Sequence, residues 1–142
     1  MCSSDLPSLA LTGASAGELP VIQGKVAVVD FWASWCAPCK ASFPALARLH
    51  SELAAQGVVV VGVGVDDRPD EFARFGARMK PPFPLVHDRE RRLARLVDLP
   101  AMPTTVLLDR AGRVRHVHRG FRGRETELEM RREINSLLAE TP

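Results

Sequence analysis

Two cysteines three residues apart, Cys36 and Cys39, carry the clearest chemistry in this sequence. They follow a short apolar run and stand where a helical pattern begins. The N–H groups of a first helical turn have no intrahelical partner, and the helix dipole adds positive potential there. A cysteine at this place ionises more readily, and the thiolate is the form that attacks a disulfide. We therefore predict thiol–disulfide exchange, in which Cys36 attacks and Cys39 resolves the mixed disulfide.

A metal site is one alternative interpretation of the cysteine pair. A closed zinc site takes four ligands, and the sequence holds no second pair of cysteines. Alternation along a strand would place His116 and His118 on one face, where they could bind a metal, but we expect that face to be open to solvent. We predict no metal and no dissociable cofactor, because the two cysteines carry the electrons themselves.

The cysteines need a strand before them and a helix after them. The valine-rich run 25–31 is typical of a buried strand, and from Pro38 to about residue 56 apolar residues recur at spacings of three and four. Gly57 ends that helix, and the run 58–65 is typical of a second buried strand. This order of elements indicates a βαβ unit with parallel strands.

The remaining elements complete an α/β domain. A helix begins at Pro69, a short strand covers 83–87, and Asp88 is a cap for the helix that follows. The turn signal at 109–112 joins strands at 104–108 and 114–118 into a hairpin. The last helix begins near Thr126, because Thr126 and Glu129 have the spacing of a capping box.

Composition sets the outer limits of the interpretation. The 142 residues, of which 46% are hydrophobic, suffice for one domain with a real core. The net charge of +2 gives no indication of nucleic acid as a partner, and no apolar run approaches the roughly 18 to 20 residues that span a bilayer. We place the domain at residues 20–142, after an N-terminal segment at 1–19.

Cys2, in that N-terminal segment, has three interpretations that stay open. Followed by two serines, it is similar to the lipidated first residue of a bacterial lipoprotein. The first residues also match the translated end of a sequencing adapter, which would make the chain a gene fragment, or they form a disordered terminus with an incidental cysteine. None of these interpretations makes Cys2 catalytic.

Two motifs resemble those of thioredoxins. The run 29–40, VDFWASWCAPCK, is similar to their active-site segment, and 101–105, AMPTT, is similar to their cis-proline loop. The resemblance covers about 20–138 and implies the thioredoxin fold, a central mixed β-sheet flanked by helices. It also implies that the backbone of Met102 pairs with a bound substrate strand and that Pro103, in a cis bond that costs about 0.5–1 kcal/mol, keeps a third ligand from the sulfurs. Trp35 and Pro38 complete the expected substrate-binding residues.

An extra segment at about 66–88, expected as a helix and a short strand, narrows the resemblance. Plain thioredoxins lack it, and it is similar to the insertion of the TlpA/ResA/DsbE-like reductases, as is the run 103–114. The resemblance implies a protein of the bacterial cell envelope, periplasmic or held by an N-terminal anchor, that reduces protein disulfides as in cytochrome c biogenesis. Its partners would be protein thiols and disulfides, and an upstream dithiol protein that donates electrons.

Two residues depart from that family. Ser42 stands where a glutamate is frequent, so any role of that carboxylate is absent. Asp30 stands where asparagine is frequent and resembles the buried acid of thioredoxins, but the strand 58–65 lacks the lysine that accompanies the acid there. Burial without a partner raises the pKa of a carboxyl group. We therefore predict that Asp30 is catalytic, as a relay for a proton to or from Cys39.

Other functions share parts of this motif. A disulfide-forming oxidant would use the same two cysteines and would differ in its reduction potential. A copper- or zinc-binding module would hold metal in stoichiometric amounts. A peroxidase of the related peroxiredoxin group is disfavoured, because the threonine-and-cysteine motif expected before the helix is missing.

Overall fold

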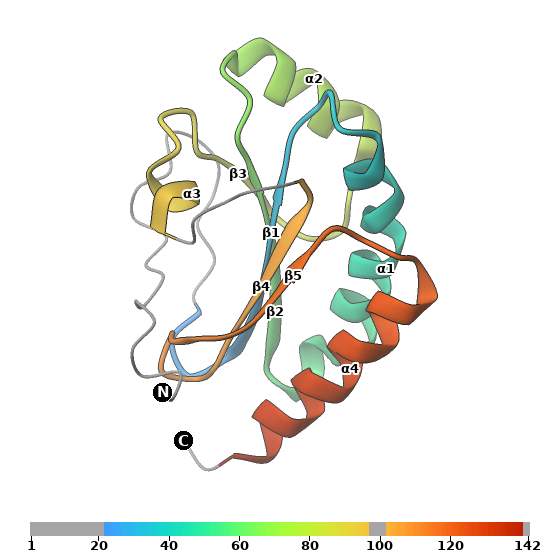
Figure 1. Cartoon of the computed structure of the whole chain (residues 1–142), viewed down its shortest axis with the longest axis vertical. Coiled ribbons are helices and arrows are strands. Elements are labelled where there is room, and N and C mark those ends of the chain that lie inside the picture. The colour runs from blue at the N-terminus through green and yellow to red at the C-terminus, as the bar shows by residue number, and fades with distance from the viewer. Residues whose placement is uncertain (1–21, 97–101, 141–142) are drawn as a thin grey trace.

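The computed structural model describes residues 22–96 and 102–140, which form one five-stranded sheet with helices against it (Figure 1). The order of strands is β3-β2-β1-β4-β5. They are β1 (Val26–Trp32), β2 (Val58–Gly64), β3 (Leu85–His87), β4 (Thr104–Leu108) and β5 (Val114–Arg119). β2 runs parallel to β1 and β3, whereas β4 runs antiparallel to β1 and β5. The predicted mixed sheet is confirmed. The segment 1–19 with Cys2 lies outside the described residues, and the domain boundary stays a prediction.

The helices lie on both sides of this sheet. They are α1 (Ala37–Leu53), extended by the 3₁₀ turn η3 (Ala54–Gln56), then α2 (Pro69–Met79), α3 (Arg92–Leu96) and α4 (Arg124–Ala139). α1 and α4 cover one side and α3 lies on the other (Figure 1). Gly57, with a φ of 96°, ends the η3 turn as predicted. The insertion expected at 66–88 is confirmed as helix α2 followed by the edge strand β3.

An aromatic cluster fastens α1 and α2 to the end of β1. Trp32 is fully buried, stacks on Phe75 with the ring centroids 4.4 Å apart, and meets the edge of Phe43 at 5.8 Å. Phe72 stacks on Trp32 at 5.6 Å and on His87 at 4.5 Å. The insertion is thus packed against the point where β1 leads into the loop that carries the cysteines.

Gly64→Ala is expected to destabilise the protein by about 1–3 kcal/mol, because the aromatic cluster leaves no room for a side chain there. A Cβ atom at Gly64 would lie 2.7 Å from Phe72 Cδ1 and 2.8 Å from Trp32 Cζ2. Gly76→Ala in α2 is the control, since its Cβ would meet a terminal methyl group of Leu85 at 3.3 Å and alanine favours a helix by up to ~1 kcal/mol. Urea denaturation measures both variants, and equal losses would contradict the prediction.

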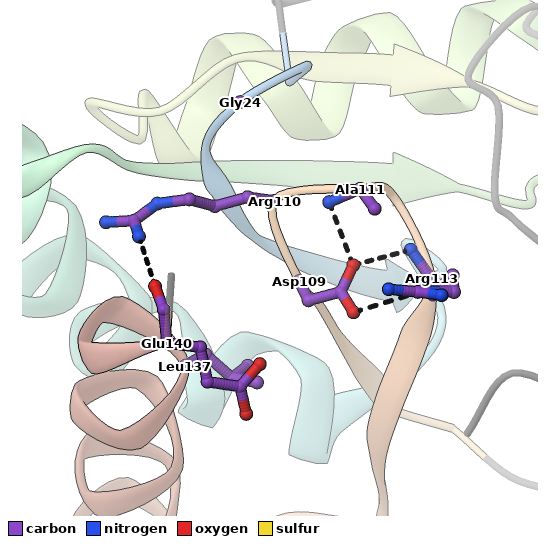
Figure 2. Close-up of a pocket in the computed structure, with 7 residues that line it drawn as sticks. All are labelled: Gly24, Asp109, Arg110, Ala111, Arg113, Leu137 and Glu140. Atoms are coloured by element: carbon purple, nitrogen blue, oxygen red, sulfur yellow. Dashed lines mark hydrogen bonds and ion pairs between the residues drawn. The ribbon is translucent and has the colours of Figure 1, made fainter. Parts of the chain in front are cut away.

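The hairpin turn between β4 and β5 is held by Asp109. Its Oδ1 accepts hydrogen bonds from the backbone N–H groups of Ala111 and Arg113, at 2.9 and 3.0 Å (Figure 2). Beside the turn, Arg110 donates to the carbonyl oxygen of Glu140 at the end of α4 (Figure 2). These contacts surround a small pocket between the turn and the end of α4, and the Arg110 contact fixes the hairpin to that helix.

The solvent exposure expected for His116 and His118 holds only in part, because the His116 side chain is 35% exposed and the His118 side chain only 13%. His118 Nε2 lies 2.6 Å from Glu133 Oε1, and His116 Nδ1 lies 3.4 Å from Glu133 Oε2. Helix α4 covers this face of β5 and presents Glu129 and Glu133 to the two rings. Within residues 22–96 and 102–140, no group of three or more potential ligands is arranged to hold a metal ion.

The capping box expected at Thr126 and Glu129 is wrong. Helix α4 begins earlier, at Arg124, with Gly123 as its N-cap at a positive φ of 64°. Thr126 lies in the first turn, where its Oγ1 accepts a hydrogen bond from the backbone N–H of Arg122 at 2.9 Å. The Thr126 hydroxyl therefore stabilises the chain before the helix, which the spacing of a capping box cannot reveal.

Candidate active site

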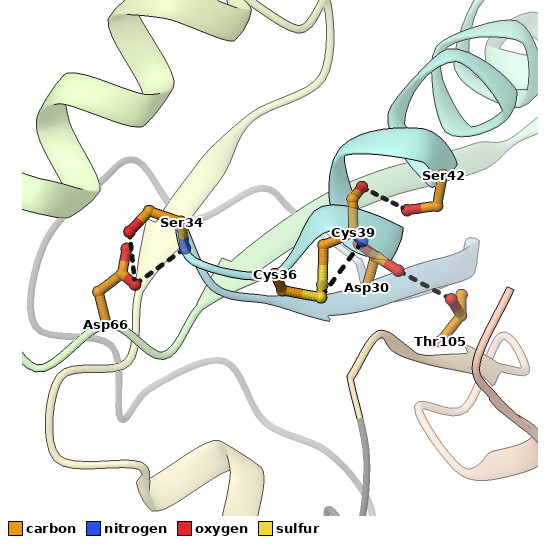
Figure 3. Close-up of a disulfide and its surroundings, with 7 residues drawn as sticks. All are labelled: Asp30, Ser34, Cys36, Cys39, Ser42, Asp66 and Thr105. Carbon is orange, nitrogen blue, oxygen red and sulfur yellow. Dashed lines mark hydrogen bonds between the residues drawn. A yellow bond between two sulfur atoms is a disulfide. The ribbon is translucent and has the colours of Figure 1, made fainter.

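Cys36 and Cys39 are joined in a disulfide at the amino end of α1 (Figure 3). Their Cα atoms lie 5.3 Å apart. Cys36 is the N-cap of α1, and its Sγ accepts a hydrogen bond from the backbone N–H of Cys39 at 3.3 Å. Cys36 is 5% exposed, whereas Cys39 is fully buried. The outer sulfur is thus the one that a free N–H group of the helix would stabilise as a thiolate.

Asp30 is an ionisable group on the α1 face of the sheet. Side chains alternate along a strand, so Asp30 shares a face of β1 with Trp32, which packs on α1. Figure 3 shows its carboxylate on the Cys39 side of the disulfide. Asp30 is completely buried, and Thr105 Oγ1, opposite it in β4, donates to Oδ1 at 2.8 Å. Among the described residues, Oδ2 has no hydrogen-bond partner.

This environment changes the protonation of Asp30. Burial raises the pKa of Asp30 to about 7, although the hydrogen bond from Thr105 acts to lower it. The sequence prediction of a raised pKa therefore agrees with the structure. Thr105 was missed as a partner, because it becomes visible only once the register of β1 and β4 is known.

Ser42 occupies the place of the frequent family glutamate. It is buried, and its hydroxyl group donates to the carbonyl oxygen of Cys39 at 2.8 Å. The side chain thus binds the backbone of α1 and brings no carboxylate to the sulfurs.

Trp35 and Pro38 lie on the outer side of the cysteine pair. The side chain of Trp35, directly before Cys36, is 67% exposed. Pro38 is exposed in the first turn of α1, where a proline is tolerated because its missing N–H group would have no helical partner. Both residues are therefore open to an approaching protein.

Met102 and Pro103 lead into β4. The peptide bond between them is cis, and the Pro103 carbonyl oxygen accepts a hydrogen bond from the backbone N–H of Gly120 at 2.7 Å. The next residue, Thr104, pairs with Phe31 of β1. Pro103 therefore lies beside the carboxyl end of β1, where the chain leaves the sheet and enters the loop that carries the cysteines.

Asp66 is a residue of this region that the sequence analysis did not identify. Its Oδ1 accepts hydrogen bonds from the backbone N–H and the hydroxyl group of Ser34, at 2.9 and 3.1 Å (Figure 3). Ser34 precedes Cys36 by two residues. One signal was present, because Asp66 follows strand β2 and the carboxyl ends of parallel strands meet at one edge of a sheet.

A mixed sheet, a disulfide-bonded cysteine pair at the start of a helix and a cis-proline before the next strand define a thioredoxin-like domain. The chain belongs to the AhpC/TSA family, whose family model matches residues 5–117.

Similar proteins narrow the assignment within this family. The chain is 34% identical over 113 residues to thiol-disulfide oxidoreductase ResA of Bacillus subtilis, covering 78% of this chain and 63% of the relative. It is 36% identical over 92 residues to thiol:disulfide interchange protein HelX of Rhodobacter capsulatus, covering 64% and 50%. It thus spans about half to two thirds of these relatives. A Chlorobium tepidum crystal structure, assigned as thiol:disulfide interchange protein DsbE, has a TM-score of 0.79 at 34% identity and 83% coverage of both chains. The predicted resemblance to the TlpA/ResA/DsbE-like proteins is confirmed.

Proposed function

We propose that this domain catalyses thiol–disulfide exchange and acts as a reductase of protein disulfides. The observation that carries the proposal is the Cys36–Cys39 disulfide at the amino end of α1, with the more exposed cysteine, Cys36, at the N-cap. The names of the similar proteins agree with this chemistry.

The two cysteines of the reduced domain supply both electrons of the reaction. The Cys36 thiolate attacks one sulfur of a substrate disulfide, which forms a Cys36–substrate disulfide and releases the other substrate sulfur as a thiolate. The Cys39 thiolate then attacks the Cys36 sulfur, which closes the Cys36–Cys39 disulfide and releases the second substrate thiolate. Two electrons pass from the domain to the substrate. A partner dithiol protein returns them by the same exchange.

Asp30 takes the Cys39 proton in this scheme. A carboxyl group with a pKa of about 7 can both accept and return a proton near neutral pH. Its burial on the α1 face and its position on the Cys39 side of the disulfide support the assignment.

The substrate chain is proposed to lie across the outer sulfur. Trp35 and Pro38 would contact it on the α1 side, Met102 would pair with its backbone, and Pro103 would exclude other ligands from the sulfurs. The exposure of Trp35 and Pro38, and the place of Pro103 at this edge of the sheet, support these roles.

We place the protein in the bacterial cell envelope, with protein disulfides of the cytochrome c biogenesis type as substrates and a dithiol protein as electron donor. This location follows the likeness to ResA, HelX and DsbE, and an N-terminal anchor stays a prediction. Within residues 22–96 and 102–140, no helix combines the length and apolar character needed to cross a membrane.

The reduction potential of Cys36–Cys39, measured by equilibration with glutathione and with dithiothreitol, tests the direction of electron flow. We expect a value nearer to the roughly −270 mV of thioredoxin than to the roughly −120 mV of strong oxidants. We also expect the reduced protein to reduce insulin disulfides. A potential near the roughly −120 mV of strong oxidants would make the protein a disulfide-forming oxidant. Absence of exchange with any disulfide would overturn the proposal.

Trp35→Ala is expected to lower kcat/KM for a protein disulfide by about tenfold, because an exposed aromatic at the centre of an interface is often worth more than 1 kcal/mol. The rate with the small aromatic disulfide DTNB should stay within about twofold of wild type. The free energy of unfolding should stay within ~0.5 kcal/mol of wild type. Leu128→Ala, which removes an exposed apolar side chain from α4, is the control and should change neither rate. A similar loss with both substrates would argue against a docking role.

A further inference from the structure

Asp66 fixes the loop that carries Cys36. The backbone N–H and the hydroxyl group of Ser34 donate to the same oxygen, Oδ1, at 2.9 and 3.1 Å. Asp66 is 1% exposed, so its carboxylate is largely removed from water, while Ser34 is half-buried. Its Oδ2 is buried and has no partner among the described residues. Because removing a carboxylate from water is unfavourable, keeping one here for a single loop suggests a role beyond packing.

The insertion holds Asp66 from the opposite side. His87 of β3 places its Nε2 2.7 Å from the backbone carbonyl oxygen of Asp66, and its ring stacks on Phe72 of α2 at 4.5 Å. The residue before Asp66 is also fixed, because the Val65 N–H donates to the carbonyl oxygen of Trp32 at 2.9 Å. The contacts therefore run without interruption from α2 and β3, through Asp66, to the cysteine loop.

We propose that Asp66 is a positioning residue for the Cys36 nucleophile, and that the insertion α2–β3 acts on the redox pair through it. The inference rests on the proposed function, since it concerns the same exchange reaction. Asp66 contacts neither sulfur in any described interaction. It holds Ser34, and Cys36 follows two residues later in a turn closed by the hydrogen bond from the Cys36 N–H to the Ala33 carbonyl oxygen at 3.1 Å.

Holding this turn favours the closed disulfide. When the pair is reduced, a loop anchored at Ser34 keeps the Cys36 sulfur close to Cys39, so little conformational freedom is lost when the sulfurs join. Without the anchor the reduced loop gains freedom, and closure becomes less favourable. The disulfide should then be easier to reduce, and the reduced domain should be a weaker reductant.

Asp66→Ala tests the anchor, with Asp88→Ala as a matched control. Asp88 is also fully buried after a strand, with Oδ2 bound to the N–H of Ala94 and Oδ1 without a described partner, and it has no described contact with the loop 33–36. We expect the equilibrium constant for closing the Cys36–Cys39 disulfide, measured against glutathione, to fall about tenfold in Asp66→Ala, or about 30 mV. It should change less than twofold in Asp88→Ala. Equal shifts in both variants would overturn the proposal.

Two milder variants keep the test informative if Asp66→Ala does not fold. Asp66→Asn retains an oxygen that can accept from the Ser34 N–H, so it should stay within about threefold of wild type. Ser34→Ala removes the hydroxyl donor and should shift the constant two- to threefold in the direction of Asp66→Ala. A tenfold shift in Asp66→Asn would indicate a charge effect and contradict positioning, as would an unchanged constant in Ser34→Ala. Failure of the wild-type protein to exchange disulfides would instead remove the proposed function itself.

Discussion

Cys39→Ser is expected to accumulate as a covalent complex with its substrate, whereas Cys36→Ser is expected to form none. Cys36 at the N-cap is 5% exposed, whereas Cys39 is fully buried. With Cys39 absent, the Cys36–substrate disulfide forms but no second sulfur is near enough to resolve it. Turnover should fall by about 10³-fold or more in either variant, as it commonly does when a covalent nucleophile is lost.

The measurement is mass spectrometry of the protein after mixing with an oxidised protein substrate, with non-reducing electrophoresis as a second readout. Both variants should carry Cys2→Ser as well, because Cys2 is the third cysteine of the chain and could capture substrate on its own. Capture by Cys36→Ser but not by Cys39→Ser would reverse the assigned roles. Full activity of both variants would exclude the mechanism.

The elements of the fold could be predicted because each leaves a local pattern. Valine-rich strands before and after an amphipathic helix gave the βαβ unit, and the turn at 109–112 gave the hairpin. The insertion was visible for the same reason, as a helix begun by a proline and a short apolar run. The Cys36–Cys39 pair follows from its place between a strand and a helix, which needs no knowledge of distant contacts.

Contacts between distant elements could not be predicted in this way. The rings of His116 and His118 meet Glu133 because α4 packs over β5, and the pattern of β5 does not state which helix will cover it. Thr105 meets Asp30 only through the register of β4 against β1. Asp66 binds Ser34 across 32 residues of sequence. In each case the hydrogen-bond or ion-pair partner of a side chain lies far away in the sequence, and local periodicity does not indicate which residues will pair.

Asp30→Asn is expected to stabilise the oxidised protein at pH 8 and to change it little near pH 4. The folded carboxyl has a pKa of about 7, against 3.8 for the ordinary group. Between these values the folded state holds a proton that the unfolded state has released, so the free energy of unfolding falls as pH rises. The contribution of Asp30 to stability is fully present below about pH 4 and is lost as pH rises through 7. Three pKa units set a ceiling of about 4 kcal/mol.

Asparagine should remove this dependence, because its amide cannot ionise and its oxygen can still accept from Thr105. Urea denaturation at pH 4, 6 and 8 should show the variant gaining about 2–4 kcal/mol over wild type at the highest pH. Asp109→Asn is the control of opposite sign. Burial acts to raise the pKa of Asp109, but the N–H groups of Arg113 and Ala111, the hydrogen bond from Arg115 and the charge of Arg113 together outweigh it, so the pKa lies below its ordinary value. Asp109→Asn should therefore destabilise the protein at pH 8.

Asp30→Asn should also distinguish a catalytic role of the Asp30 carboxyl group from its effect on stability. If the carboxyl relays the Cys39 proton, Asp30→Asn gains stability yet slows exchange by about 10²-fold, the lower end of the usual range for general acid–base catalysis. The step near pH 7 that is expected in the pH profile of wild-type exchange should also be absent from the profile of the variant. A variant that is more stable at pH 8 and exchanges at the wild-type rate would make Asp30 a buried acid without a catalytic role. A variant no more stable than wild type at pH 8 would mean that Asp30 does not carry the raised pKa.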